Sequence, residues 1–149
     1  MIKVKVTKLN SQALIPSYMS SGAAGCDIHA CIDSKILVKP GERLAIPTGL
    51  SVEIPPGYEI QVRPRSGLAF KKGLTVINAP GTIDSDYRGE IKVLVVNLGS
   101  EGVDVSPNDR IAQMVLQQVS QIEWLEVENL SSTERGVGGF GSTGVTAPN

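Results

Sequence analysis

Glycine and proline interrupt this chain at short intervals, and the stretches between them are rich in valine and isoleucine. Such spacing disfavours long helices, because proline lacks a backbone donor and ordered glycine loses the most backbone freedom. Residues 2–7 and 58–63 alternate apolar and polar side chains with period two, as half-buried strands do. Residues 91–96 and 114–119 are more continuously apolar, which is typical of strands buried on both faces. Many short strands with regular turn signals predict an all-β sandwich or barrel.

One stretch, residues 66–73, does not fit a strand. Its leucine, alanine and lysines are good helix formers, Ser66 could cap the amino end, and Gly73 suits the carboxyl end. We therefore expect one short helix over residues 66–72.

Size and charge restrict the function classes. With 149 residues and 15.8 kDa, the chain is expected to form one domain with a real core. A net charge of −1 leaves no broad basic field for non-specific binding of nucleic acid. The amino terminus lacks a signal-peptide core, and no apolar run approaches the ~20 residues of a membrane helix. We expect a soluble, cytoplasmic protein that binds neither nucleic acid nor membrane.

Cys26, His29 and Cys31 lie close together and suggest a zinc site. Structural zinc requires four ligands, however, and the chain has no other cysteine or histidine. Two cysteines are also too few for a disulfide scaffold, so reduced thiols are expected. Hydrolases with a catalytic serine or cysteine need a histidine as general base, and this chain has only one. We therefore favour a structural role for His29.

The glycine-rich stretch at residues 135–144 carries the most functional information. Five of its ten residues are glycine, and ordering each glycine in a helix or strand costs more backbone entropy than ordering any other residue. This arm should therefore be mobile until a ligand orders it. Its arginine, phenylalanine and hydroxyls could close over a phosphorylated, ring-bearing ligand. The spacing of its glycines matches a dinucleotide fingerprint, but only eight residues follow Gly141, so the required helix is excluded. An uninvolved disordered tail remains the alternative.

Two further segments carry candidate chemistry. Arg65, Ser66 and Gly67 would place a guanidinium beside the backbone amides of a helix start, which can bind an anion, although an arginine before a helix is common. Residues 78–91 lie between apolar strands and therefore predict a β-hairpin with a polar end. A solvated turn is the alternative, but a carboxylate near an aromatic ring and open backbone could bind a sugar and a base together.

A third segment follows Pro107. Asp109 and Arg110 could form a simple surface ion pair, worth ~0–1 kcal/mol. Gln113 is unusual within an apolar strand, because a buried amide requires a hydrogen-bond partner.

Together these segments resemble the five motifs of the trimeric all-β dUTPases (deoxyuridine triphosphate nucleotidohydrolases), at residues 24–28, 64–69, 81–90, 109–117 and 135–144. The resemblance extends from about residue 2 to residue 144, and only Cys26 and Ile28 depart from the commoner residues. It implies a β-clip or jelly-roll-like distorted barrel at residues 1–134, an arm at residues 135–149, and a homotrimer with shared active sites.

The resemblance also implies the reaction: water attacks the α-phosphorus of dUTP, giving dUMP and pyrophosphate. This limits uracil incorporation into DNA and supplies dUMP for dTMP synthesis. Asp84 would hold the water and the 3′-hydroxyl, and Tyr87 would lie against the sugar and exclude a ribose 2′-hydroxyl. Uracil would be read by four residues of the hairpin, namely Asn78, Gly81, Thr82 and Lys92.

Further residues are implied by the same resemblance for the phosphates and the metal. Four would hold the phosphate chain: Arg65, Ser66, Gly67 and Gln113. Mg²⁺ would be carried mainly by the triphosphate, with Asp27 touching it through water. The arm would supply the remaining substrate-binding residues: Arg135, Ser142 and Thr143 for the γ-phosphate, Phe140 stacked on uracil, and Gly141.

Two other functions remain possible at this stage. A deoxycytidine triphosphate deaminase would share the fold and the handling of the triphosphate, but would need an acid/base glutamate over the base. A non-catalytic nucleotide sensor on the same fold is the second alternative, against which the intact Asp84 and arm argue.

Overall fold

The computed structural model describes residues 1–142 and 144, and this part of the chain forms eleven short strands and one helix. The elements in chain order are β1 (Lys5–Lys8), β2 (Cys26–His29), β3 (Ile36–Val38), β4 (Arg43–Pro47), β5 (Leu50–Glu53), β6 (Tyr58–Arg63), α1 (Ser66–Lys72), β7 (Leu74–Val76), β8 (Gly81–Ile83), β9 (Lys92–Asn97), β10 (Val103–Val105) and β11 (Arg110–Gln118). The prediction of an all-β fold with one short helix is confirmed.

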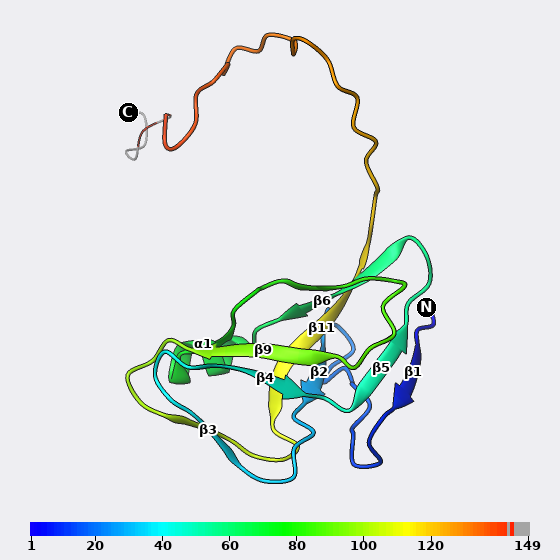
Figure 1. Cartoon of the computed structure of the whole chain (residues 1–149), viewed down its shortest axis with the longest axis vertical. Helices are drawn as coiled ribbons and strands as arrows, with labels where there is room; N and C mark the ends of the chain where they lie inside the picture. Colours follow the sequence, from blue (N-terminus) through cyan, green and yellow to red (C-terminus); the bar gives the residue numbers. More distant parts are fainter. Residues whose placement is uncertain (143, 145–149) are drawn as a thin grey trace.

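The strands form two main sheets and two smaller pairs, all antiparallel (Figure 1). One sheet has the order β2-β11-β6-β8 and the other β4-β9-β7. Strands β1 and β5 form one pair, and β10 and β3 form the other. Strands that pair in a sheet can lie far apart in the sequence, as β2 and β11 do, so the fold brings distant segments of the chain together.

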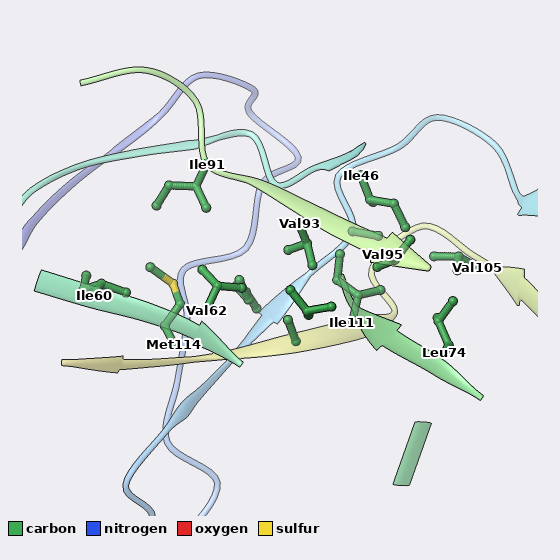
Figure 2. Close-up of a cluster of buried hydrophobic side chains, with 14 of the residues drawn as sticks. Ile46, Ile60, Val62, Leu74, Ile91, Val93, Val95, Val105, Ile111 and Met114 are labelled. Carbon is green, nitrogen blue, oxygen red and sulfur yellow. The ribbon is translucent and has the colours of Figure 1, made fainter. Parts of the chain in front are cut away.

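The core lies between the two main sheets (Figure 2). Ile60 and Val62 of β6 are buried while Arg63 is exposed, as the period-two pattern predicts. Strand β9 departs from the expectation of burial on both faces, because Leu94 is 39% exposed and lines a cavity. Strand β1 is exposed along its whole length in the single chain.

Helix α1 occupies the expected residues, but its amino end differs from the prediction. Arg65, and not Ser66, is the N-cap residue, and its side chain makes no capping hydrogen bond. Gly73 ends the helix in the left-handed conformation, with φ of 68°, and its N–H donates to the carbonyl of Ala69. A side chain at Gly73 would overlap the backbone of Gly99, so this position requires glycine twice over.

The predicted hairpin around residues 78–91 is confirmed at its base, where β7 pairs with β9. Its polar end is more than a turn, because β8 leaves the hairpin and pairs with β6, placing Gly81 opposite Val62. The connection from β7 to β9 therefore spans both main sheets. This departure positions the candidate site described below.

The chain leaves the body after β11. Residues 119–142 form no helix or strand and project away from the sheets, as Figure 1 shows in orange and red. The division at residues 134 and 135 stays a prediction, since the last described strand already ends at Gln118. Within the described residues, no helix is long and apolar enough to cross a membrane.

Candidate active site

The connection between β7 and β9 encloses a cavity of about 420 Å³. Six of the residues predicted to bind or attack the substrate line it: Asn78, Gly81, Thr82, Asp84, Tyr87 and Lys92. Five others complete the wall: Val62, Ile83, Glu90, Ile91 and Leu94. The cavity thus combines apolar walls with a few polar groups, as small-molecule sites usually do.

Glycine at position 81 leaves room for the side chain of Asn78. A Cβ there would lie 3.0 Å from Nδ2 of Asn78, so any side chain would displace the amide of Asn78. Lys92, at the start of β9, lies with its Nζ atom 3.7 Å from Oε2 of Glu90. The polar groups of the wall therefore include one amide and one ion pair.

Asp84 and Tyr87 belong to one tight turn. The backbone N–H of Tyr87 donates to the carbonyl of Asp84 at 3.2 Å, and the Tyr87 hydroxyl donates to the carbonyl of Glu90 at 3.0 Å. Arg88 folds back over the same loop and donates to the carbonyls of Ser85 and Tyr87, at 2.7 and 2.9 Å. These bonds fix the backbone of the turn from which both side chains project.

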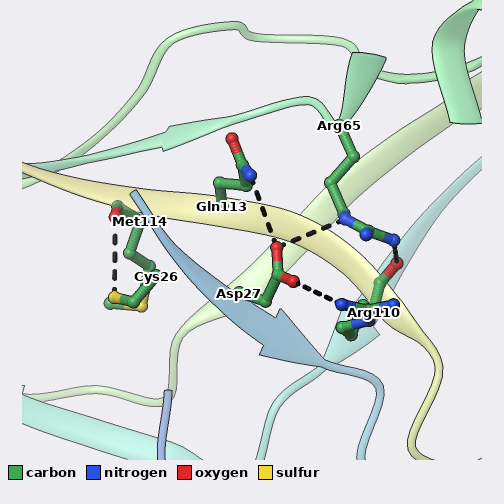
Figure 3. A network of polar contacts seen from close by, with 6 residues as sticks. All are labelled: Cys26, Asp27, Arg65, Arg110, Gln113 and Met114. Atoms are coloured by element: carbon green, nitrogen blue, oxygen red, sulfur yellow. Dashed lines mark hydrogen bonds and ion pairs between the residues drawn. The ribbon is translucent and has the colours of Figure 1, made fainter. Parts of the chain in front are cut away.

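A second cluster surrounds Asp27, whose side chain is almost fully buried (Figure 3). Its Oδ2 atom lies 3.0 Å from a terminal nitrogen of Arg110, and its Oδ1 atom lies 3.3 Å from Nε of Arg65. Nε2 of Gln113 donates to Oδ1 at 3.4 Å, and Arg65 also donates to the carbonyl of Arg110 at 3.0 Å. One carboxylate thus holds two partly exposed guanidinium groups, and the excess positive charge suits an anion.

The pairing of β2 with β11 explains this cluster. Gln113 stands opposite Asp27, and the register shifts between Arg110 and Ala112. The partner expected for the Gln113 amide is therefore Asp27. The interpretation of Asp109 and Arg110 as a surface ion pair is wrong. Asp109 accepts a hydrogen bond from the backbone N–H of Ser106 at 2.8 Å, while Arg110 pairs with Asp27.

Arg110 belongs to this cluster, although no role in binding was predicted for it from the sequence. A signal existed, because a carboxylate between Cys26 and Ile28 needs cationic partners when it is buried. Ser66 and Gly67 lie exposed at the start of α1, next to Arg65. Apart from its chain neighbours and the backbone of α1 itself, nothing lies within 4 Å of the place where a Gly67 Cβ would stand, so a ligand could approach the backbone there.

His29 neighbours this cluster. Its Nδ1 atom is buried and has no hydrogen-bond partner within the described residues. Burial lowers the pKa of His29, an effect that the carboxylate of Asp27 partly offsets. Both cysteines are free, and burial raises the pKa of each thiol. Among the described residues, no group of three or more histidine, cysteine or acidic side chains could hold a metal.

The arm residues do not reach either cluster. Nε of Arg135 donates to the carbonyl of Gly138 at 2.7 Å, and the ring of Phe140 is fully exposed. Gly141 and Ser142 lie in a turn of the same projecting segment, and Thr143 lies outside the described residues. None of Asp27, Arg65, Ser66, Gly67 and Gln113 lines the cavity either. One chain therefore presents the predicted site in three separate parts.

Comparison with known proteins identifies the family. The dUTPase family profile matches residues 11–144. Proteins of Nautilia profundicola and Fusobacterium nucleatum, each named deoxyuridine 5'-triphosphate nucleotidohydrolase, are 59% and 56% identical, covering 96% and 97% of this chain and 99% of each relative. A mutant dUTPase of Staphylococcus bacteriophage 80alpha, solved with dUpNHpp, is 27% identical and covers 96% of this chain and 99% of that chain, with a TM-score of 0.83.

A further solved structure agrees in fold. A mutant dUTPase of phage phi11 of S. aureus, described with a structural Mg(II) ion, has a TM-score of 0.76 at 23% identity, covering 87% of this chain and 99% of that chain. No match favours a deaminase or a sensor among the relatives and structures compared above. Because the profile spans most of its length and the relatives match it almost end to end, the chain belongs to the dUTPase family.

Proposed function

We propose a mechanism by which this dUTPase hydrolyses dUTP to dUMP and pyrophosphate. Asp84 positions a water molecule for attack at the α-phosphorus and accepts its proton, a role usually worth ~10²–10⁴-fold in rate. The place of Asp84 in the cavity wall, one turn from Tyr87, supports this assignment. Its carboxylate also accepts a hydrogen bond from the 3′-hydroxyl, which fixes the sugar relative to the water.

The cavity takes the base and the sugar. Backbone groups around Gly81, Thr82 and Lys92 read the edge of uracil, with Asn78 assisting; all four residues line the cavity. In a narrow site of this kind the methyl group of thymine would overlap with the wall, so thymine is rejected. An apolar pocket that merely accommodates the methyl group would discriminate between the two bases by only ~1–3 kcal/mol. Tyr87 lies against the deoxyribose and leaves no room for a 2′-hydroxyl.

The cluster around Asp27 takes the phosphate chain. Arg65, Gln113 and the open backbone at Ser66 and Gly67 bind phosphate oxygens, and Arg110 joins them. Asp27 holds the two arginines in place before the substrate arrives, so little ordering cost remains at binding. Pre-positioned cations of this kind stabilise charge on a departing pyrophosphate.

Mg²⁺ fits this site as an ion carried by the triphosphate. A carboxylate offers about four lone-pair positions, and donors from Arg65, Arg110 and Gln113 already use three of those on Asp27. One position remains on Oδ2, which could accept a hydrogen bond from a water molecule on the ion. Magnesium keeps several waters and favours phosphate oxygens. When bound, it would neutralise charge that develops on the pyrophosphate.

The arm closes the site. Arg135, Ser142 and Thr143 bind the γ-phosphate, Phe140 stacks on uracil, and Gly141 lets the backbone approach the ligand. The exposure of Phe140 supports this proposal, since a large ring costs free energy in water until it finds a partner surface.

A homotrimer with shared sites is the assembly that brings the three parts together. No residue of the Asp27 cluster lines the cavity, and this observation carries the proposal. Two apolar surfaces also lack cover in the single chain. One is a groove of about 270 Å³ beside β1, and the other is the projecting segment with Trp124, Leu125 and Leu130 exposed. Patches of this kind mark interfaces.

We also place the protein in the cytoplasm, where its free cysteines stay reduced. Its partners there are dUTP and its own copies.

Mixing two inactive variants tests the shared site. Asp84→Asn lacks the carboxylate in the cavity, and Arg110→Ala lacks a guanidinium of the phosphate cluster. Unfolded together and refolded as one mixture, they should regain up to about a quarter of wild-type activity if the two parts come from different copies, because random assembly leaves that share of sites intact. A sedimentation measurement should show trimers. No recovered activity in mixed trimers would mean that both parts come from one copy.

A further inference from the structure

We propose that Gly89 is a positioning residue for sugar selectivity, because it leaves the space in which the ring of Tyr87 lies. The inference rests on the proposed role of Tyr87 at the deoxyribose, and it adds a second residue on which that role depends. Gly89 is itself outside the cavity wall.

The ring of Tyr87 lies directly against the backbone of Gly89. A Cβ at position 89 would stand 2.6 Å from Cζ and 2.9 Å from Cε2 of the ring. Both distances are shorter than carbon atoms tolerate, since carbon pairs are most stable at about 3.5–4.0 Å. Any side chain at this position therefore forces the ring or the backbone to move.

The backbone around Gly89 is anchored. The buried hydroxyl of Ser51 donates to the carbonyl of Arg88 at 2.7 Å, and the N–H of Gly49 donates to Oε1 of Glu90 at 3.0 Å. Ile91, one residue further, donates to the carbonyl of Leu50 at 2.8 Å. Strand β5 and the residue before it thus hold this segment on both sides of Gly89.

The ring of Tyr87 has more freedom. It is 44% exposed, and its overlapping atoms are the far end of a side chain with two rotatable bonds. A methyl group at position 89 should therefore displace the ring and leave the backbone in place. Gly89 does not adopt the left-handed conformation, so alanine meets no backbone strain there. The variant should fold normally.

Displacement of the ring opens the cavity wall beside the sugar. The Tyr87 hydroxyl would then lose the hydrogen bond of 3.0 Å that it donates to the carbonyl of Glu90. The backbone bond between Tyr87 and Asp84 does not involve the ring, so the carboxylate should keep its position. The expected effect is a loss of discrimination between deoxyribose and ribose, with the chemical step largely retained.

Gly89→Ala tests the inference through the ratio of kcat/KM for dUTP to kcat/KM for UTP. We expect this ratio to fall by at least ~10-fold, with kcat for dUTP changed by less than about 3-fold. Gly22→Ala is the control, because an added Cβ there meets no atom within 4 Å. Thermal unfolding of both variants should resemble the wild type.

Tyr87→Ala and the double variant separate the possible failures. If Gly89 acts only through the ring, adding Gly89→Ala to Tyr87→Ala should change the ratio no further. An additive loss, an unchanged ratio in Gly89→Ala, or an equal loss for both nucleotides would overturn the role of Gly89. An unchanged ratio in Tyr87→Ala would instead remove the proposed role of Tyr87, and the inference with it.

Discussion

Replacing Asp27 with asparagine should destabilise the protein more than any single surface charge change. The carboxylate is the only negative group among the described residues that pairs with Arg65 or Arg110. Asparagine keeps the size of the side chain, but its amide oxygen can accept from one guanidinium while its NH₂ group faces the other. Two cations then lie side by side without a counter-charge.

The size of the effect follows from burial. Breaking a fully buried ion pair by removing one partner costs about 3–5 kcal/mol. Asp27 is 3% exposed at its side chain, but Arg65 and Arg110 are 26% and 42% exposed, so water recovers part of the loss. A decrease of ~1–3 kcal/mol in the free energy of unfolding is therefore expected. For a chain of this length, that corresponds to a fall in Tm of about 2–12 °C.

Asp104→Asn is the matched control. Asp104 pairs with Lys35 at 2.9 Å, but both side chains are more than half exposed, at 52% and 60%. Its loss should change the free energy of unfolding by less than about 1 kcal/mol. Urea unfolding of both variants and the wild type at one protein concentration would measure the difference. If Asp27→Asn were no less stable than Asp104→Asn, the reasoning about burial would be refuted.

Four further outcomes are expected. Asp84→Asn should bind dUTP but turn it over at least ~10²-fold more slowly; near-native turnover would remove the role given to Asp84. Truncation after Thr133 should leave a folded trimer that hardly hydrolyses dUTP, and a monomer would show instead that the arm is structural. Phe140→Ala should mainly raise KM, and unchanged kinetics would contradict stacking. Burial lowers the pKa of His29, so the unfolded chain binds a proton at this side chain more readily than the folded chain does. The free energy of unfolding should therefore fall as the pH drops below about 6.5. Urea unfolding from pH 7.5 to 5.5 should show a smaller fall for the variant His29→Asn than for the wild type.

Local patterns in the sequence predicted the fold well. The alternation over residues 58–63 corresponds to β6, and Gly73 ends α1 as its type suggests. Ser66 failed as a cap because the helix begins one residue earlier than the side chain requires, with Arg65 at the N-cap. Leu94 is exposed although its neighbours are apolar, because the hairpin opens into a cavity there.

Long-range pairing limited what could be predicted about the site. Apart from Val62, the residues that line the cavity all come from residues 78–94, so a motif could identify them. Arg110 was missed because its partner, Asp27, lies 83 positions away and is reached only through the β2–β11 pairing. The pairing of β8 with β6 could not be predicted either, because a hairpin pattern over residues 78–91 does not indicate which other strand pairs with a strand inside its loop.

The most direct test of the account is to incubate the purified protein with Mg²⁺ in heavy-oxygen water. Four nucleotides would be supplied separately, dUTP, dCTP, dTTP and UTP, and the products identified by mass spectrometry. We predict dUMP and pyrophosphate from dUTP alone, with the heavy oxygen on dUMP, because water attacks the α-phosphorus. Ammonia from dCTP, heavy oxygen on pyrophosphate, or tight binding of dUTP without products would contradict the account.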